Sequence, residues 1–321
     1  MTDKKFAVVF DTNSYRQFVN GKTLEEVLTA TTQLREDEAR RNIQAFGAVI
    51  VSLELLSHLV ENEDGFNYKD CLNGILAMGN HCFDVNRKEP RIIPQPYLHI
   101  TRSFFDTVPT EMEQRVKNIG GVVNDLKNDY EKAILFHKSK GTFEDIMNYL
   151  TSEEQKFSSD IMLPIEGAKQ EILKQHPTIA QKDLRIKLLD FIDKKFEPFH
   201  AIAIIYAASI ILQKQLTEKE LIEKAFAMNL EFPLSVGFYR WISYKIVYDT
   251  IDMQSKASKE KRWNWLWDYQ ISFLMSEHTI DNREVILVTS DNDVTEMLNE
   301  FGYENKVLTI SQYLEYLKQP E

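Results

Sequence analysis

Cysteine is scarce in this chain, which has only Cys71 and Cys82 among its 321 residues. Two cysteines are too few for the disulfide framework of a small secreted domain. The segment that they bound, CLNGILAMGNHC, lacks the close ligand spacing of a zinc knuckle. The sequence therefore predicts two free, buried thiols.

Long hydrophobic runs are also lacking. The longest apolar stretch, AIAIIYAASIIL at 201–212, falls short of the roughly 20 residues that a bilayer requires. The N-terminal stretch MTDKKFAVVFDTN leaves no room for a secretory signal, because its apolar run is short and ends on Asp11. We expect a buried helix at 201–212, no contact with a membrane, and a cytoplasmic protein.

Positive charge is in short supply as well. The chain has 38 Lys and Arg against 49 Asp and Glu, which gives a formal net charge of −11. Nucleic-acid-binding proteins usually carry a basic excess, so this balance excludes a general polyanion-binding surface. It leaves room for one local basic patch, and the candidate is SKASKEKRWNWLW at 255–267.

Short apolar runs that end on polar residues recur near both ends of the chain. The first is KFAVVFDTN at 5–13, and GAVIVS at 47–52, EVILVTSD at 284–291 and KVLTIS at 306–311 resemble it. A helical pattern follows each run. Short buried strands that alternate with helices are typical of a parallel sheet in an α/β protein. We therefore predict an α/β fold with a parallel sheet flanked by helices.

Helical periodicity dominates the middle of the chain, with little strand pattern from about 110 to 252. We interpret this region as part of a large insertion. The predicted division is an N-terminal part of the α/β domain at 1–66, a mostly helical insertion at 67–252, and a C-terminal part of the α/β domain at 253–321. The insertion is the expected place for contacts with a second copy or a regulatory protein.

Acidic residues stand at the ends of these predicted strands and on the helices beside them. They are Asp11, Glu54, Asp268, Asp291 and Asp293. Parallel α/β sheets bind their ligands at the carboxyl ends of the strands. Two carboxylates about 4 Å apart repel each other by roughly 4 kcal/mol at an effective dielectric constant near 20. Such a cluster needs protons, which implies raised pKa values, or a cation such as Mg²⁺ or Mn²⁺.

The order of these motifs resembles that of PIN-domain nucleases: VVFDTN, SLELLSHL, WDYQISFLM and then VTSDND. The resemblance covers roughly 1–66 and 255–321. It implies a parallel sheet with helices on both faces and metal-dependent cleavage of RNA that leaves a 5′-phosphate and a 3′-hydroxyl. The implied catalytic and metal-binding residues are Asp11, Glu54, Asp268 and Asp291, with Asp293 as an accessory acid, Asn13 positioning Asp11, and Thr289 or Ser290 supplying a hydroxyl.

The basic segment at 255–267 offers a contact for RNA. Lys256, Lys259, Lys261 and Arg262 suit phosphates, and an exposed Trp263 or Trp265 could stack on an unpaired base. We therefore expect a single-stranded or loop RNA substrate.

Other functions fit parts of the same pattern. A catalytically inactive PIN-like scaffold could act through the insertion as a protein-interaction module, and a flap-type nuclease would cut DNA. A haloacid-dehalogenase-like phosphatase also begins with a strand that ends on Asp. That chemistry needs a second Asp two residues later, where this chain has Asn13, which cannot transfer a proton. The scaffold and the DNA nuclease remain open from the sequence.

Overall fold

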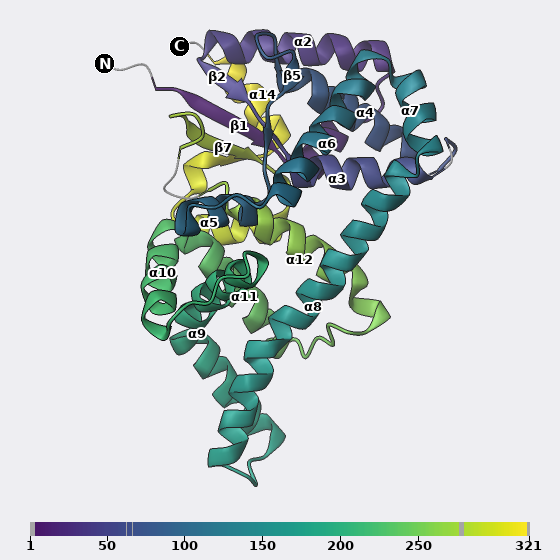
Figure 1. The fold of residues 1–321 in the computed structure, drawn as a ribbon. Coiled ribbons are helices and arrows are strands. Elements are labelled where there is room, and N and C mark those ends of the chain that lie inside the picture. Colours follow the sequence, from purple (N-terminus) through teal and green to yellow (C-terminus); the bar gives the residue numbers. More distant parts are fainter. Residues whose placement is uncertain (1–3, 62, 66, 276–278, 320–321) are drawn as a thin grey trace. The chain divides into compact units, whose positions relative to one another are not determined.

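The computed structural model describes residues 4–61, 63–65, 67–275 and 279–319, leaving aside the side chains of 195–199. The chain forms two compact units (Figure 1). Unit 1 comprises 1–99, 108–150 and 278–321, and unit 2 comprises 100–107 and 151–277. The structure is 71% helical with a small parallel sheet flanked by helices, so the predicted mixed α/β class is confirmed.

These units differ from the division expected from the sequence. Residues 67–99 and 108–150, expected in the helical insertion, belong to unit 1 with the sheet. Residues 253–277, expected beside the last strands, belong to unit 2. The difference has a physical reason: helical periodicity shows that a segment is helical but not which core its apolar face covers.

The parallel sheet of unit 1 has the strand order β2-β1-β7-β8. Its strands are β1 (Phe6–Phe10), β2 (Ile43–Ala45), β7 (Glu284–Val288) and β8 (Val307–Leu308). The apolar side chains of the two central strands, β1 and β7, are almost wholly buried, as expected for a sheet covered on both faces. Phe10 pairs with Val288, so the residues that follow these two strands leave the sheet at the same edge.

Helices cover the sheet and complete unit 1 (Figure 1). They are α1 (Thr12–Val19), α2 (Leu24–Arg40), α3 (Val49–Ser57), α4 (Tyr68–His81), α6 (Thr110–Asn128), α7 (Tyr130–Ser139), α13 (Asn292–Glu300) and α14 (Ile310–Lys318). Short strand pairs lie beside the main sheet: β3 (Gly47–Ala48) with β6 (Ile92–Ile93), and β4 (Phe83–Asp84) with β5 (Glu89–Pro90).

The strand predicted at 47–52 was wrong. Only Gly47 and Ala48 are extended, and α3 begins at Val49. The run VIVS forms the first turn of a helix that is buried on nearly every side. A short apolar run of this kind is compatible with either a buried strand or a buried helix, and its periodicity cannot separate the two.

A buried hydrogen-bond network joins four helices in the core of unit 1. His81 on α4 lies 2.8 Å from Glu38 on α2 through its Nε2 and 3.0 Å from the Tyr15 hydroxyl on α1 through its Nδ1. Tyr313 on α14 donates to Glu38 at 2.8 Å. All four side chains are buried, and polar groups in such a place must be hydrogen-bonded to be tolerated. The network therefore holds α1 in a defined position on the sheet.

Both cysteines lie in unit 1 as free, buried thiols, as predicted. Cys82 contacts the Tyr15 hydroxyl at 3.4 Å. Burial raises the pKa of each thiol to about 12, so both stay protonated near neutral pH. They contribute to the core as small apolar side chains.

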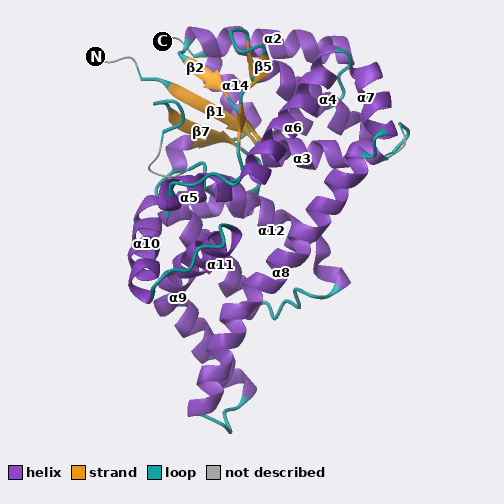
Figure 2. Cartoon of the chain, in the orientation of Figure 1, coloured by secondary structure: helices purple, strands orange, loops and turns teal. Residues whose placement is uncertain are grey.

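Unit 2 is helical, and the strands of the described chain all lie in unit 1 (Figure 2). Its helices are α5 (Pro96–Phe105), α8 (Thr142–Gln175), α9 (Gln181–Ile211), α10 (Glu218–Glu231), α11 (Pro233–Tyr248) and α12 (Lys259–Ser272), of which α5 and α8 begin in unit 1. Among the residues described, no helix has both the length and the apolar character of a membrane span.

A buried histidine lies in the core of unit 2. The ring of His200 on α9 stacks on Tyr239 with 3.6 Å between centroids, and its Nε2 lies 3.1 Å from the Tyr269 hydroxyl. Its Nδ1 is buried without a hydrogen-bond partner. Burial lowers the pKa of His200 well below its ordinary value, so the folded protein holds this side chain neutral.

We predict that His200→Phe reduces the loss of unit 2 stability in acid. In the unfolded chain His200 gains a proton below about pH 6.5, whereas the folded core keeps it neutral, so wild-type stability falls as the pH drops below that value. The loss attributable to this one group is at most about 1.4 kcal/mol per pH unit. Urea unfolding followed by tryptophan fluorescence measures it, because all four tryptophans lie in unit 2.

The matched control is His176→Phe, which changes an exposed histidine of the same unit. This control should keep the pH dependence of the wild type. Identical acid sensitivity in His200→Phe and the wild type would contradict the assignment of a buried neutral imidazole.

Candidate functional site

Asp11 follows β1 directly and caps the N-terminus of α1. Its Oδ1 accepts a hydrogen bond from the Ser14 backbone N–H at 2.5 Å, the arrangement expected of an N-cap aspartate. The side chain of Asp11 is buried, with 7% of the residue exposed. The sequence changes abruptly from apolar residues to Asp-Thr-Asn because the strand ends there and a helix capped by Asp11 begins.

Thr289 joins the end of β7 to Asp11. Its hydroxyl donates to Oδ2 of Asp11 at 2.6 Å, and the Asp291 backbone N–H donates to the same hydroxyl oxygen at 3.0 Å. Asp291 in turn caps α13 by accepting from the Val294 N–H at 3.0 Å. The β1–β7 register therefore gathers Asp11, Thr289 and Asp291 at one edge of the sheet, as the sequence predicted for strand-end residues.

The environment of Asp11 disfavours its charge. Burial raises the pKa of Asp11 above its ordinary value, and the nearby negative charge of Asp291 raises it further. Hydrogen bonds from Ser14 and Thr289 oppose this shift, because they stabilise the ionised carboxylate. A buried carboxylate with a raised pKa at the end of a strand is a site at which a bound cation would restore the charged form.

Glu54 reaches the same region from α3. The hydroxyl of Thr12, the residue after Asp11, donates a hydrogen bond to Oε2 of Glu54. Glu54 lies in the middle of α3, where the neighbouring Leu53 and Leu55 are fully buried and Glu54 itself is half-buried. The helix thus directs this one acidic side chain toward the N-terminus of α1.

The remaining predicted site residues have different surroundings. Asp293 is half-buried in the first turn of α13, and the Ser290 hydroxyl donates to Oε1 of Gln17 at 2.9 Å. Asp268 lies on α12 and belongs to unit 2, so it does not share a unit with the other acidic residues. Asn13 is exposed on α1.

Ser14 and Thr289 hold the two oxygens of Asp11, whereas the sequence assigned the positioning of Asp11 to Asn13 and predicted only that Thr289 or Ser290 would supply a hydroxyl. Sequence reasoning did not anticipate the contributions of Thr12 and Ser14. Ser14 had a usable signal, because an aspartate that caps a helix bonds the backbone two or three residues further on. Thr12 had no such signal in the sequence, since its contact with Glu54 spans 42 positions.

The donor chemistry of this site suits a hard cation. Asp11, Asp291 and Glu54 offer carboxylate oxygens, the ligands that Mg²⁺ and Mn²⁺ prefer. Within the described part of the chain, however, no three His, Cys, Asp or Glu side chains form a ready-made metal-binding group. Mg²⁺ commonly binds through one or two protein carboxylates and completes its shell with water and substrate phosphate. The residues present fit that mode of binding.

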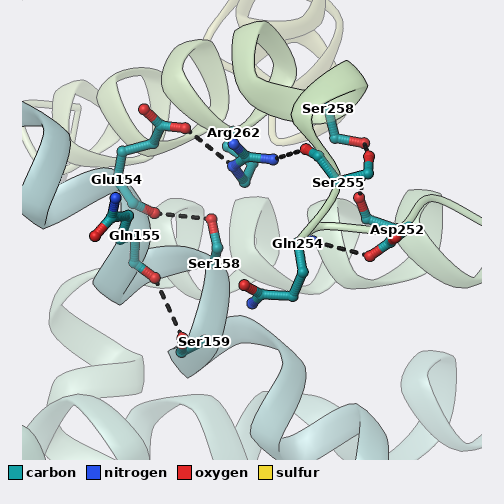
Figure 3. Close-up of polar contacts among 9 residues, drawn as sticks. All are labelled: Glu154, Gln155, Ser158, Ser159, Asp252, Gln254, Ser255, Ser258 and Arg262. Carbon is teal, nitrogen blue, oxygen red and sulfur yellow. Dashed lines mark hydrogen bonds and ion pairs between the residues drawn. The ribbon is translucent and has the colours of Figure 1, made fainter.

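The basic segment considered for RNA lies in unit 2, and one of its residues is committed to an ion pair. Arg262 Nε donates to Glu154 at 2.9 Å, and another guanidinium nitrogen donates to the Ser255 carbonyl oxygen (Figure 3). Both members of the ion pair are buried, with Arg262 9% and Glu154 2% exposed. Because a buried pair leaves an uncompensated charge when it is broken, Arg262 is not available for phosphate.

Its neighbours remain accessible. Lys256, Lys259 and Lys261 are exposed and Trp263 is half-buried, whereas Trp265 is buried in the core and has no face free for a base. Lys259 Nζ lies 5.9 Å from the ring centroid of Trp263, within the range of a cation–π contact. These residues are therefore the part of the segment that is accessible to a polyanion such as RNA.

We predict that Asp11→Asn stabilises unit 1 in the absence of metal. A raised pKa means that the folded state holds its proton more tightly than the unfolded state, so stability falls as the pH rises through the folded pKa. Above the folded pKa the buried carboxylate therefore lowers the stability of unit 1. The amide has the same shape and removes this cost. Hydrogen exchange of the β1 and β7 amides in EDTA measures the gain, which should shrink toward pH 4.

Glu296→Gln, an exposed change on α13, is the matched control and should leave exchange unchanged. If the β1 and β7 amides exchange faster in Asp11→Asn than in the wild type at pH 7, the carboxylate stabilises the fold and the prediction is wrong.

Comparisons of the chain with protein-family models, with curated proteins and with solved structures give no match.

Proposed function

We propose that this chain is a metal-dependent endoribonuclease with a PIN-like fold that acts on single-stranded or loop RNA. The observation that carries the proposal is the convergence of Asp11, Thr289 and Asp291 at one edge of the parallel sheet, with Glu54 bonded to Thr12. This edge is where parallel sheets bind ligands. The order of the acidic motifs along the chain supports the same reading.

Each side chain has a proposed role. Asp11, Asp291 and Glu54 hold the cation, and Asp293 assists them. The hydroxyl of Thr289 and the backbone of Ser14 fix the Asp11 carboxylate, which keeps its oxygens in one orientation as substrate arrives. Mg²⁺ or Mn²⁺ held by these residues would supply an activated water and would neutralise the charge that develops on the leaving 3′ oxygen. For Asp268, on α12 of unit 2, the order of the motifs is the sole support for a catalytic role.

We predict metal-dependent cleavage of end-labelled single-stranded RNA that yields a 5′-phosphate and a 3′-hydroxyl. Asp11→Asn, Glu54→Gln and Asp291→Asn should each lower the rate by at least about 100-fold, the scale seen when electrostatic stabilisation of a transition state is removed. The assay compares Mg²⁺, Mn²⁺ and EDTA, with single-stranded DNA of the same sequence as a parallel substrate. Asp268→Asn tests the carboxylate of unit 2 separately.

Glu296→Gln is the matched control and should cut at the wild-type rate. Preferential cleavage of DNA would favour the flap-type alternative. Absence of cutting combined with absence of metal binding would favour the inactive scaffold. Metal binding is measured independently as thermal stabilisation, which amounts to about 1.4 kcal/mol at ten times the dissociation constant and should vanish in Asp11→Asn.

We further predict that the exposed lysines of the basic segment contact RNA. The double change Lys259→Glu with Lys261→Glu should weaken the binding of single-stranded RNA. It should also reduce the slope of log affinity against log salt by about 1.4, since each phosphate contact on a single strand contributes about 0.7. Binding is measured by fluorescence anisotropy in an Asp11→Asn background, which prevents cleavage of the probe.

Lys182→Glu with Lys187→Glu is the control pair, because these lysines are also exposed in unit 2 and the net charge changes equally. An equal effect of both pairs would mean that overall charge, rather than a local contact, governs binding.

A further inference from the structure

Arg16 on α1 is a half-buried arginine beside the acidic residues of unit 1. It follows Thr12 by four positions, so both side chains lie on one face of the helix, about 6 Å apart along its axis. On that face the Thr12 hydroxyl donates a hydrogen bond to Glu54. Arg16 therefore lies on the face of α1 that meets Glu54.

The thiol of Cys71 responds to the charges of both Arg16 and Glu54. Burial raises the pKa of the Cys71 thiol, the Arg16 guanidinium opposes that rise, and the Glu54 carboxylate adds to it. Charges shift a pKa in this way when they lie near the titrating group. The guanidinium and the carboxylate are therefore neighbours of the same sulfur atom on α4.

The guanidinium of Arg16 is held by a neutral group. One of its terminal nitrogens donates to the amide oxygen of Asn67 at 2.7 Å. Within the residues that the structure describes, Arg16 forms no ion pair, whereas the buried Arg262 is paired with Glu154. A guanidinium has five N–H donors in a planar fork, so most of this capacity is left for an anion. Asn67 thus orients the side chain but does not neutralise it.

We propose that Arg16 binds a backbone phosphate of the nucleic acid that is cut at the acidic site. This inference rests on the proposed function and adds a substrate-binding residue to it. A group of carboxylates repels a polyanion, so the substrate needs positive charge from the protein as well as from the cation. The guanidinium fork matches two phosphate oxygens, and its place one helical turn beyond Thr12 suits a phosphate next to the one that is cut.

A structural role for Arg16 is the competing explanation. In that case its positive charge would only balance the nearby carboxylates of the folded protein. Replacing Arg16 would then lower the stability of unit 1 and leave the number of phosphate contacts unchanged. The salt dependence of RNA binding separates the two roles, because it measures how many phosphates the protein neutralises.

The test measures binding of a labelled single-stranded RNA to the full-length protein by fluorescence anisotropy at several salt concentrations. Every protein carries Asp11→Asn, which prevents cleavage of the probe. We expect Arg16→Gln to weaken binding about tenfold at low salt, the scale of one hydrogen bond to a charged group. It should also reduce the slope of log affinity against log salt by about 0.7, the contribution of one phosphate contact.

Two further variants keep the positive charge. Arg16→Lys retains the charge and loses the planar fork, so it should keep the slope and lose less affinity than Arg16→Gln. Asn67→Ala removes the group that orients the guanidinium and should weaken binding without changing the slope. These two variants also test the proposal if Arg16→Gln proves unstable, and circular dichroism verifies that each variant is folded.

Arg40→Gln is the matched control. Arg40 is exposed at the end of α2, shortly before β2 begins, so it lies at the opposite edge of the parallel sheet from the strand end that carries Asp11. The change removes the same charge from unit 1 and should alter neither the affinity for RNA nor the slope.

A cleavage assay with the protein that retains Asp11 separates this proposal from the proposed function. If that protein cuts RNA while Arg16→Gln changes neither affinity nor slope, the role of Arg16 is wrong and the function stands. If it does not cut while Arg16→Gln lowers the slope, Arg16 contacts nucleic acid and the catalytic function is wrong. Absence of RNA binding in all of these proteins would overturn the role of Arg16.

Discussion

The site depends above all on the parallel pairing of β1 with β7. The hydrogen bond from Thr289 to Asp11 joins residues 278 positions apart, and it forms only because Phe10 lies opposite Val288. A shift of the register by one residue would turn alternate side chains to the other face and separate the two strand ends. The candidate metal site is therefore a property of the sheet, although its residues stand on loops and helix caps.

The position of α1 is the second requirement, because Asp11 caps this helix. Tyr15, one turn further along α1, is held by His81, which is itself held by Glu38. Buried polar groups that are fully hydrogen-bonded favour one arrangement over its neighbours, since any shift would leave a donor or acceptor unpaired. The core network thus fixes the helix whose first turn presents Asp11, Thr12 and Ser14 at the edge of the sheet.

The site and the rest of the fold make opposite demands. Burial, with the nearby charge of Asp291, raises the pKa of Asp11 and so disfavours its ionised form, while hydrogen bonds from Ser14 and Thr289 hold the carboxylate in place. Sites that are strained or charged in this way are typical places where function opposes stability. In unit 2 the Arg262–Glu154 pair is different, because its charges compensate each other and its contribution is structural.

By itself the sequence determined what is local in this protein. The strand before Asp11, the strand before Thr289 and the capping of helices by Asp11 and Asp291 all follow from patterns within a few residues. Tertiary structure decided the rest. It made Val49 the start of a buried helix, tied Thr12 to Glu54 and turned Arg262 toward Glu154. Burial and the pairing of distant residues depend on the whole core. The residues next to an apolar run or a charged side chain do not indicate which distant residues it will contact.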